Sequence, residues 1–310
     1  MSPLVLPPYS GAVAARVNRW LLRRTVLRVA AQVGGARPLV WTFLPTDTAV
    51  TIIDELDPCG VVYWCLTDFA VITPQRAALA ESERALLART DVVFAQYEQL
   101  AADLRRQHGN VHVVPFGVDL AAFRTDAARE RPAAAQPVIG YVGGLHWHVD
   151  LELVARAARL RPGWRFVFVG SEHTNVDALR REPNIELRGM RPHEELVEHI
   201  LGFDVCIVPY MLSEYTATVV PTKINEYLAV GRPVVSTPMP AVLDFQAEHQ
   251  VLELANPRAE DFVAAIERAL ETADDPDAVE RRRRVAALSD WSARFAGMNQ
   301  VIDEAIGPVR

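Results

Sequence analysis

The chain alternates, twice over, between short apolar runs and amphipathic stretches, and this alternation constrains the fold more than any other feature. Runs such as 60–65 and 138–142 are typical of strands buried on both faces. The stretches between them carry apolar residues at helical spacing. Strands that alternate with helices predict parallel, doubly wound sheets. The predicted strands are 38–44, 60–65, 91–95 and 111–115 in the first half, and 138–142, 165–169, 184–188, 204–209, 233–237 and 251–253 in the second.

A small, polar and proline-rich segment, residues 125–137, lies between the two halves and predicts a linker. With 310 residues, half of them apolar, the chain is long enough for two cores. We therefore expect two tandem Rossmann-like domains, 1–130 and 131–290. A C-terminal helical segment, 291–310, can cross back to the N-terminal domain.

The chain has 32 basic side chains, and only Lys223 among them is a lysine. A chain that otherwise uses arginine suggests that a compact ammonium is needed at this place. Pro221 suits the first position of a helix and Gly231 the position after its end, so Lys223 and Thr222 are expected in the first helical turn. Unpaired N–H groups there favour an anion, and Glu226 lies on the same face. A phosphate next to a hydroxylated group fits this pair; a surface ion pair is the alternative.

A glycine pair, Gly143-Gly144, follows the predicted strand 138–142. Residues without side chains let backbone amides approach a phosphate, although such a pair is often only a turn. His146 and His148 come next and are candidates to contact a sugar or a diphosphate. A His-x-His pair also suggests a metal, but no third ligand is evident in the sequence, and we predict no metal site.

Asp68 follows the predicted strand 60–65. Ligands of open parallel sheets bind at the carboxyl ends of the strands, so Asp68 is a candidate for the catalytic base. Capping of the next loop or helix is an equally good explanation.

Charge is distributed unevenly. The net charge of −7 argues against nucleic acid as a partner, whereas residues 1–46 hold six arginines and no acid. The predicted helix 14–32 places Val17, Trp20, Leu21 and Leu27 at helical spacing among arginines. Such a helix can lie on an anionic membrane, or it can pack on a sheet with its arginines solvated.

Targeting signals are not evident. No apolar run is long enough for a membrane span, and the arginines follow the early apolar residues instead of preceding them as in a signal peptide. Three cysteines, Cys59, Cys65 and Cys206, lack metal-ligand spacing. We expect a cytoplasmic protein with reduced thiols, peripheral at the inner membrane face if the basic helix binds there.

Several strings of residues together resemble GT-B glycosyltransferases of family 4 (group 1) and their lysine-motif variants. Val113–Asp119 is similar to the end of the family's N-terminal domain, and Ile139–Leu145 to the first strand and glycine turn of its donor domain. The order and spacing of the strings carry the resemblance. Later elements of the donor domain are resembled by 184–189, 203–209 and 221–235.

The resemblance implies transfer of a hexose from a nucleoside-diphosphate sugar to the hydroxyl of a saccharide or lipid-linked acceptor, in cell-envelope polysaccharide or glycolipid synthesis. It implies no cofactor besides this substrate. Glu226 would bind the ribose, and Met190 lies where the family holds the base. An acid near Asp68 is the general base in some relatives, which would imply inversion; retention and inversion both stay open.

The chain also departs from the family pattern. Thr218 stands where the first of two paired glutamates is expected, and His146-Trp147-His148 stands where many relatives have an arginine and a lysine, which would leave Lys223 as the main phosphate cation. The N-terminal domain is expected to be shortened. A non-catalytic nucleotide-sugar-binding subunit is therefore an alternative, and a nucleotide-sugar epimerase a weaker one.

Overall fold

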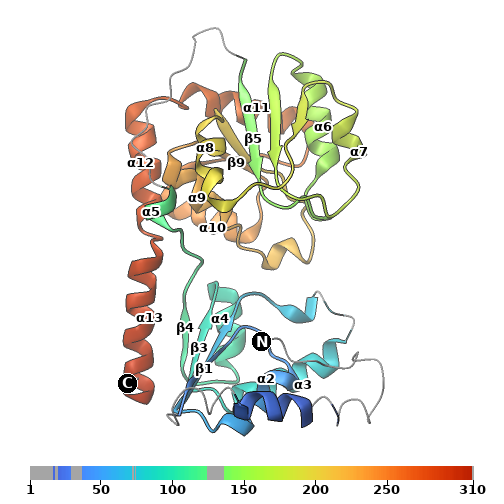
Figure 1. Ribbon diagram of the computed structural model, residues 1–310. Helices are drawn as coiled ribbons and strands as arrows, with labels where there is room; N and C mark the ends of the chain where they lie inside the picture. Colours follow the sequence, from blue (N-terminus) through green and yellow to red (C-terminus); the bar gives the residue numbers. More distant parts are fainter. Residues whose placement is uncertain are drawn as a thin grey trace. The chain divides into compact units, whose positions relative to one another are not determined.

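The computed structural model describes residues 17, 20–28, 37–71, 73, 75–123 and 136–308. The chain divides into two compact units, and Figure 1 shows each with its own sheet. The first comprises Met1–Pro115 and Phe295–Arg310, and the second Phe116–Arg294. Most of the predicted linker, residues 124–135, lies outside the described residues.

The first unit contains a parallel sheet in the order β1-β2-β3-β4. Every residue of β2 is buried, as expected for a strand with helices on both faces. Gly60 begins β2 against helix α13, where an added Cβ would lie 2.3 Å from the Ile306 side chain. The elements are β1 (Leu39–Thr42), α2 (Asp47–Leu56), β2 (Gly60–Cys65), η1 (Phe69–Val71), α3 (Arg76–Leu87), β3 (Val92–Ala95), α4 (Glu98–Arg105), β4 (Val111–Val113) and α13 (Trp291–Ile306).

The predicted helix 14–32 is described only at residue 17 and residues 20–28, which are helical. Leu22 and Val26 are the buried positions, whereas Trp20 is 53% and Leu27 48% exposed. Arg23 forms an ion pair with Glu55 of α2, 2.9 Å long. The described part of the helix therefore packs through Leu22 and Val26, while Val17, Trp20 and Leu27 are exposed and Leu21 is half-buried.

The second unit contains a six-stranded, all-parallel sheet in the order β10-β9-β8-β5-β6-β7. Counted from β5, this is the doubly wound order 3-2-1-4-5-6. The predicted parallel, doubly wound class is confirmed. The strands are β5 (Val138–Val142), β6 (Arg165–Val169), β7 (Ile185–Leu187), β8 (Val205–Val208), β9 (Val234–Ser236) and β10 (Leu252–Leu254).

Helices connect these strands on both faces of the sheet (Figure 1). Helix α10 was not predicted: Pro240 occupies its first position, but only Val242 of its residues is buried, so the apolar periodicity that signals a helix is weak. The helical elements are α5 (Leu120–Phe123), α6 (Leu151–Leu160), α7 (Asp177–Arg180), η2 (His193–Glu195), α8 (Leu196–Leu201), η3 (Thr216–Thr218), α9 (Lys223–Val230), α10 (Pro240–His249), α11 (Ala259–Glu271) and α12 (Pro276–Ala287).

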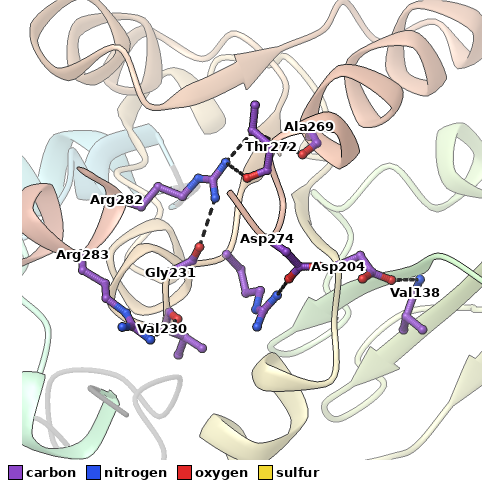
Figure 2. A network of polar contacts seen from close by, with 10 residues as sticks. Val138, Asp204, Val230, Gly231, Ala269, Thr272, Asp274, Arg282 and Arg283 are labelled. Carbon is purple, nitrogen blue, oxygen red and sulfur yellow. Dashed lines mark hydrogen bonds and ion pairs between the residues drawn. The ribbon is translucent and has the colours of Figure 1, made fainter. Parts of the chain in front are cut away.

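Buried arginines hold the carboxyl end of α9. Arg282 of α12 is 5% exposed and donates hydrogen bonds to the Gly231 carbonyl and to the carbonyl and hydroxyl of Thr272, as Figure 2 shows. Arg283 donates to the Val230 carbonyl at 3.5 Å, and Arg232 pairs with Asp274 at 3.2 Å. Cations stabilise the carboxyl end of a helix because its last carbonyls carry partial negative charge. This end of α9 is therefore fixed.

Candidate functional site

The second sheet reverses its strand order between β5 and β8, which are neighbours. Connections leave these two strands toward opposite sides, and ligands of doubly wound folds bind at the carboxyl ends of the strands at such a switch point. Gly143 follows β5, and Pro209 and Tyr210 follow β8. Most of the predicted donor-side residues lie in these loops or on α9.

Gly143 and Gly144 form the backbone turn that follows β5 at the switch point. Gly143 has a φ of +138°, a conformation that favours glycine, and its N–H is already bonded to the Val169 carbonyl at 2.8 Å. An added Cβ at Gly143 would lie 3.2 Å from Lys223 Cε, and one at Gly144 would lie 2.7 Å from His146 Nε2. Because neither glycine has a side chain, the Lys223 side chain and the His146 imidazole can approach the backbone closely.

Lys223 is the first residue of α9, two positions later than predicted, because the Pro221 and Thr222 carbonyls accept bonds from Ile224 and Asn225 in a tight first turn. Its Nζ donates to Tyr210 Oη and lies 5.0 Å from the Tyr210 ring centroid and 5.2 Å from that of Tyr141. Two tyrosines thus hold the ammonium beside Gly143.

Across the described residues Lys223 and Glu226 form no ion pair, so the surface ion pair considered above is not what the structure shows. Glu226 lies one turn further along α9 and is half-buried. Burial raises the pKa of its carboxyl, and Lys223 and His193 oppose this rise. Thr222 precedes the helix, and its side chain does not cap it.

Tyr227 joins α9 to the glycine turn. Its ring is fully buried, and its hydroxyl accepts a hydrogen bond from the Val142 N–H at 2.8 Å and donates to the Val142 carbonyl at 3.3 Å. Val142 directly precedes Gly143, so this side chain fixes Lys223 and Glu226 relative to the turn. Sequence reasoning missed Tyr227; a polar aromatic one turn after Lys223 on the apolar face of the helix was the available signal.

Three histidines form a column of stacked rings beside Gly144. The ring of His146 lies between that of His173, 4.2 Å away and 2° from parallel, and that of His148, 5.6 Å away and 11° from parallel. Burial, then the neighbouring histidine, then Lys223 lower the pKa of His148 to about 4, and the same kinds of cause lower the pKa of His146. The sequence pointed to His146 and His148 but not to His173, which comes from the loop after β6.

The geometry of the stacked histidines does not suit a metal ion. Imidazole lone pairs lie in the ring plane, so rings stacked nearly parallel cannot direct their nitrogens at one ion. In the described part of the chain, no group of three or more histidine, cysteine or carboxylate side chains could hold a metal.

Trp147 lies next to the histidine column, on the surface of the second unit. It is 55% exposed, and its ring lies 5.0 Å from that of Tyr215, which in turn lies 5.4 Å from His148. The loop after β5 pairs with the loop after β8 through an antiparallel bridge between Val149 and Tyr210. An exposed aromatic surface therefore adjoins the histidine column.

Two further residues were predicted, Met190 and Asp68. Met190 follows Gly189, whose φ is +69°, and is 79% exposed. Asp68 belongs to the first unit, where it follows β2 and its carbonyl accepts a bond from the Val71 N–H at the end of η1. The structure thus brings together Gly143, Gly144, His146 and Lys223, with Glu226 on the same helix as Lys223 and Thr222 directly before it.

Comparison with known proteins agrees with this geometry. Residues 136–272 match the family described as Glycosyl transferases group 1. The match covers less than half of the chain. A protein named as a teichuronic acid biosynthesis glycosyltransferase, TuaH of Bacillus subtilis (strain 168), is 28% identical over 233 residues. That similarity covers 71% of this chain and 59% of TuaH, so the chain spans less than two thirds of the relative's length.

Solved glycosyltransferase structures share the fold. Sucrose-phosphate synthase from Thermosynechococcus elongatus has a TM-score of 0.72 at 22% identity, covering 98% of this chain and 81% of that one. Anabaena HepE, in complex with UDP and glucose, has a TM-score of 0.71 at 13% identity, covering 96% and 84%. The two Rossmann-like units are those of a GT-B glycosyltransferase fold.

Proposed function

We propose that the protein is a glycosyltransferase that moves a sugar from a nucleoside-diphosphate sugar to an acceptor hydroxyl in cell-envelope polysaccharide synthesis. The observation that carries this proposal is the position of Lys223. The chain's one lysine lies at the N-terminal end of α9, beside Gly143 and at the switch point of the sheet. Family and relatives support the same reaction class.

The chemistry explains why a cation belongs there. When the sugar's anomeric carbon is attacked, the nucleoside diphosphate leaves and gains negative charge. A fixed ammonium and the positive end of a helix stabilise that charge because they need no reorganisation. The tyrosines around Lys223 hold the ammonium in place without neutralising it.

For the donor, we propose a UDP-sugar first, with GDP- and dTDP-sugars as alternatives. HepE, whose fold this chain shares, is described in complex with UDP-glucose. Lys223 would contact the diphosphate and Glu226 the ribose hydroxyls, since a carboxylate can accept two hydrogen bonds. Gly143, Gly144 and His146 would surround the diphosphate, and Met190 would lie near the base. No cofactor besides the donor is part of the proposal.

For the acceptor, we propose a saccharide or lipid-linked hydroxyl, with Asp68 as the general base. TuaH is named for teichuronic acid biosynthesis, which supports a cell-envelope product. Ligands of parallel sheets bind at the carboxyl ends of the strands, and Asp68 lies three residues after the end of β2.

The basic helix supports contact with an anionic membrane at the cytoplasmic face. Among its described residues, Trp20 and Leu27 are exposed, and the Arg24 guanidinium lies 4.7 Å from the Trp20 ring. Aromatic and basic side chains on one exposed surface suit a lipid interface. In the part of the chain that the structure describes, no helix has both the length and the hydropathy to cross a bilayer.

Vesicle sedimentation tests the membrane proposal. Trp20→Ala should weaken binding to anionic vesicles at low salt. Trp147→Ala is a matched control, because Trp147 is equally exposed, at 55%, but belongs to the second unit. Equal binding of wild type to neutral and anionic vesicles would refute the proposal.

Calorimetric titration of UDP-, GDP- and dTDP-glucose into wild type and Lys223→Ala tests the donor site. Removing a charge-assisted contact to phosphate should weaken the accepted donor about ten- to a hundredfold. Equal affinity in both proteins, with both folded by circular dichroism, would exclude Lys223 from the site. A protein that binds a donor but transfers no sugar to any envelope acceptor would instead be a non-catalytic binding subunit.

A further inference from the structure

Lys223 lies beside the first glycine of the pair, and the histidine column lies beside the second. Lys223 approaches the space over Gly143, while His146 and His173 approach that over Gly144, where an added Cβ would lie 2.7 Å from His146 Nε2 and 3.1 Å from His173 Cδ2. The column comes from two separate loops, after β5 and after β6. The Ser171 hydroxyl holds His173 Nε2 at 2.7 Å. The rings are therefore positioned by the fold.

The charged and titratable groups around the column come from five elements. The loop after β5 contributes His146 and His148, and its last residue, Asp150, accepts a hydrogen bond from the Leu153 N–H as the cap of α6. The loop after β6 adds Glu172, which is ion-paired with Arg180 at 2.6 Å. The loop after β8 adds Tyr210 and Tyr215, and α9 adds Lys223. Tyr141 of β5 lies beneath the ammonium, and burial raises its pKa, so it stays neutral.

This arrangement leaves a charge deficit. The diphosphate of a nucleotide sugar is a diester with two negative charges, whereas Lys223 supplies one positive charge. Burial and the nearby ammonium keep the imidazoles of His146 and His148 neutral near pH 7 in the free protein. A bound dianion would offset the influence of the ammonium and favour the charged imidazole.

We propose that His146, His148 and His173 form the second half of the diphosphate site and take up a proton when the nucleotide sugar binds. The proton comes from solvent and stays on the column as an imidazolium facing the diphosphate. The stacked rings share that one charge site, because two imidazolium ions 4 to 6 Å apart would repel each other. This inference rests on the proposed function and deepens it: donor affinity becomes dependent on pH.

The imidazolium would act on the leaving group as well as on binding. Negative charge grows on the diphosphate oxygens as the bond to the sugar breaks, and a second cation beside Gly144 would stabilise it together with Lys223. The second cation of the diphosphate site would thus be an imidazolium, which forms when the donor binds, and not a permanently charged arginine or lysine.

Titration calorimetry with UDP-, GDP- and dTDP-glucose tests the inference. The diphosphate diester of these probes has no ionisation near neutral pH, unlike the terminal phosphate of UDP, so protons taken up belong to the protein. Measurements near neutral pH in PIPES and in Tris, which differ in ionisation enthalpy, give the number of protons per donor. We expect uptake of about one half to one proton, and affinity that falls up to about tenfold for each unit of rising pH.

Two variants assign the proton. In the triple variant His146→Gln/His148→Gln/His173→Gln, uptake should drop toward zero and the affinity should lose its pH dependence. If the triple variant unfolds, the double variant His146→Gln/His173→Gln, which keeps one imidazole, should still take up fewer protons than wild type. The matched control is His112→Gln, because His112 lies on β4 of the first unit, bonded to Asn110. It should leave the uptake unchanged.

The outcomes separate this inference from the proposed function. Donor binding without proton uptake in wild type would overturn the inference alone. Uptake that persists in the histidine variants would place the proton elsewhere and also overturn it. Failure of all three donors to bind would overturn both the inference and the proposed function.

Discussion

The two ends of helix α9 both carry cations, but for different reasons. At the carboxyl end, Arg282 and Arg283 donate to the last carbonyls, where positive charge is favourable. At the amino end, Lys223 lies where the helix already presents partial positive charge, and its partners are two neutral tyrosines. A cation placed against the helix dipole contributes little to stability. The difference indicates that the arginines hold the helix and that the lysine serves a ligand.

The largest expected effect concerns neither end of α9 but the acceptor side. Asp68→Asn should lower the turnover rate by about 10²- to 10⁴-fold while leaving donor affinity unchanged, because a general base acts only on the acceptor hydroxyl in the transition state. Initial rates with a working acceptor, combined with donor calorimetry, check this pattern. An unchanged turnover rate would refute the assignment of Asp68.

At the carboxyl end of α9, substitution of Arg282 should lower the stability of the fold. Arg282→Met removes the buried donor to Gly231 and Thr272, and we expect a loss of about 3 kcal/mol of unfolding free energy. Urea unfolding gives the value. Arg281→Met is the matched control, since Arg281 is its exposed neighbour on α12 and should change stability by less than about 0.5 kcal/mol. Equal losses in both variants would contradict the assigned role.

At the amino end of α9, substitution of Lys223 should weaken donor binding, even when the new residue keeps the positive charge. Lys223→Arg should weaken donor binding nearly as much as Lys223→Ala, about ten- to a hundredfold, because a planar guanidinium does not fit the space between two tyrosines and Gly143. Calorimetry of both variants decides the point. Wild-type affinity in Lys223→Arg would mean that any positive charge suffices.

The same lysine should matter little for stability. Lys223→Ala removes an unfavourable interaction with the helix dipole and one hydrogen bond to Tyr210, and the two changes oppose each other. We expect urea unfolding to shift by less than about 0.5 kcal/mol. A loss as large as that of Arg282→Met would remove the distinction between the two ends.

The smallest effect is electrostatic. Lys223→Ala should raise the pKa of His148 from about 4 only part of the way toward 6.5, because burial is the larger cause. Between pH 6.5 and pH 4 the folded protein binds fewer protons than the unfolded protein, so the free energy of unfolding falls as pH falls from 6.5 to 4. Because Lys223→Ala narrows the pKa difference between the two states, the variant should lose less unfolding free energy over this range than wild type. NMR titration of the histidine rings, with urea unfolding at matched pH, measures both.

Strong local patterns made much of the fold predictable. Strands such as Val138–Val142 and Gly60–Cys65 are continuous apolar runs, and the predictions match their observed bounds. Helix α10 was missed because its apolar periodicity is weak. For the basic helix, the sequence left membrane contact and packing open, and the structure shows that Leu22 and Val26 are the buried positions. Where the apolar periodicity is weak, packing against the rest of the unit determines which face of a helix is buried.

The sequence by itself determined the doubly wound class, the glycine turn and the lone lysine at a helix start, because each depends on residues close together in the chain. Only the tertiary structure decided what surrounds them. Tyr141, Tyr210 and Tyr227 meet Lys223 and the glycine turn because β5 and β8 end, and α9 begins, at one edge of the sheet. His173 joins His146 because β5 and β6 are neighbours. Parallel strands need long crossover connections, so the residues that share a site lie far apart in sequence and carry no common local signal.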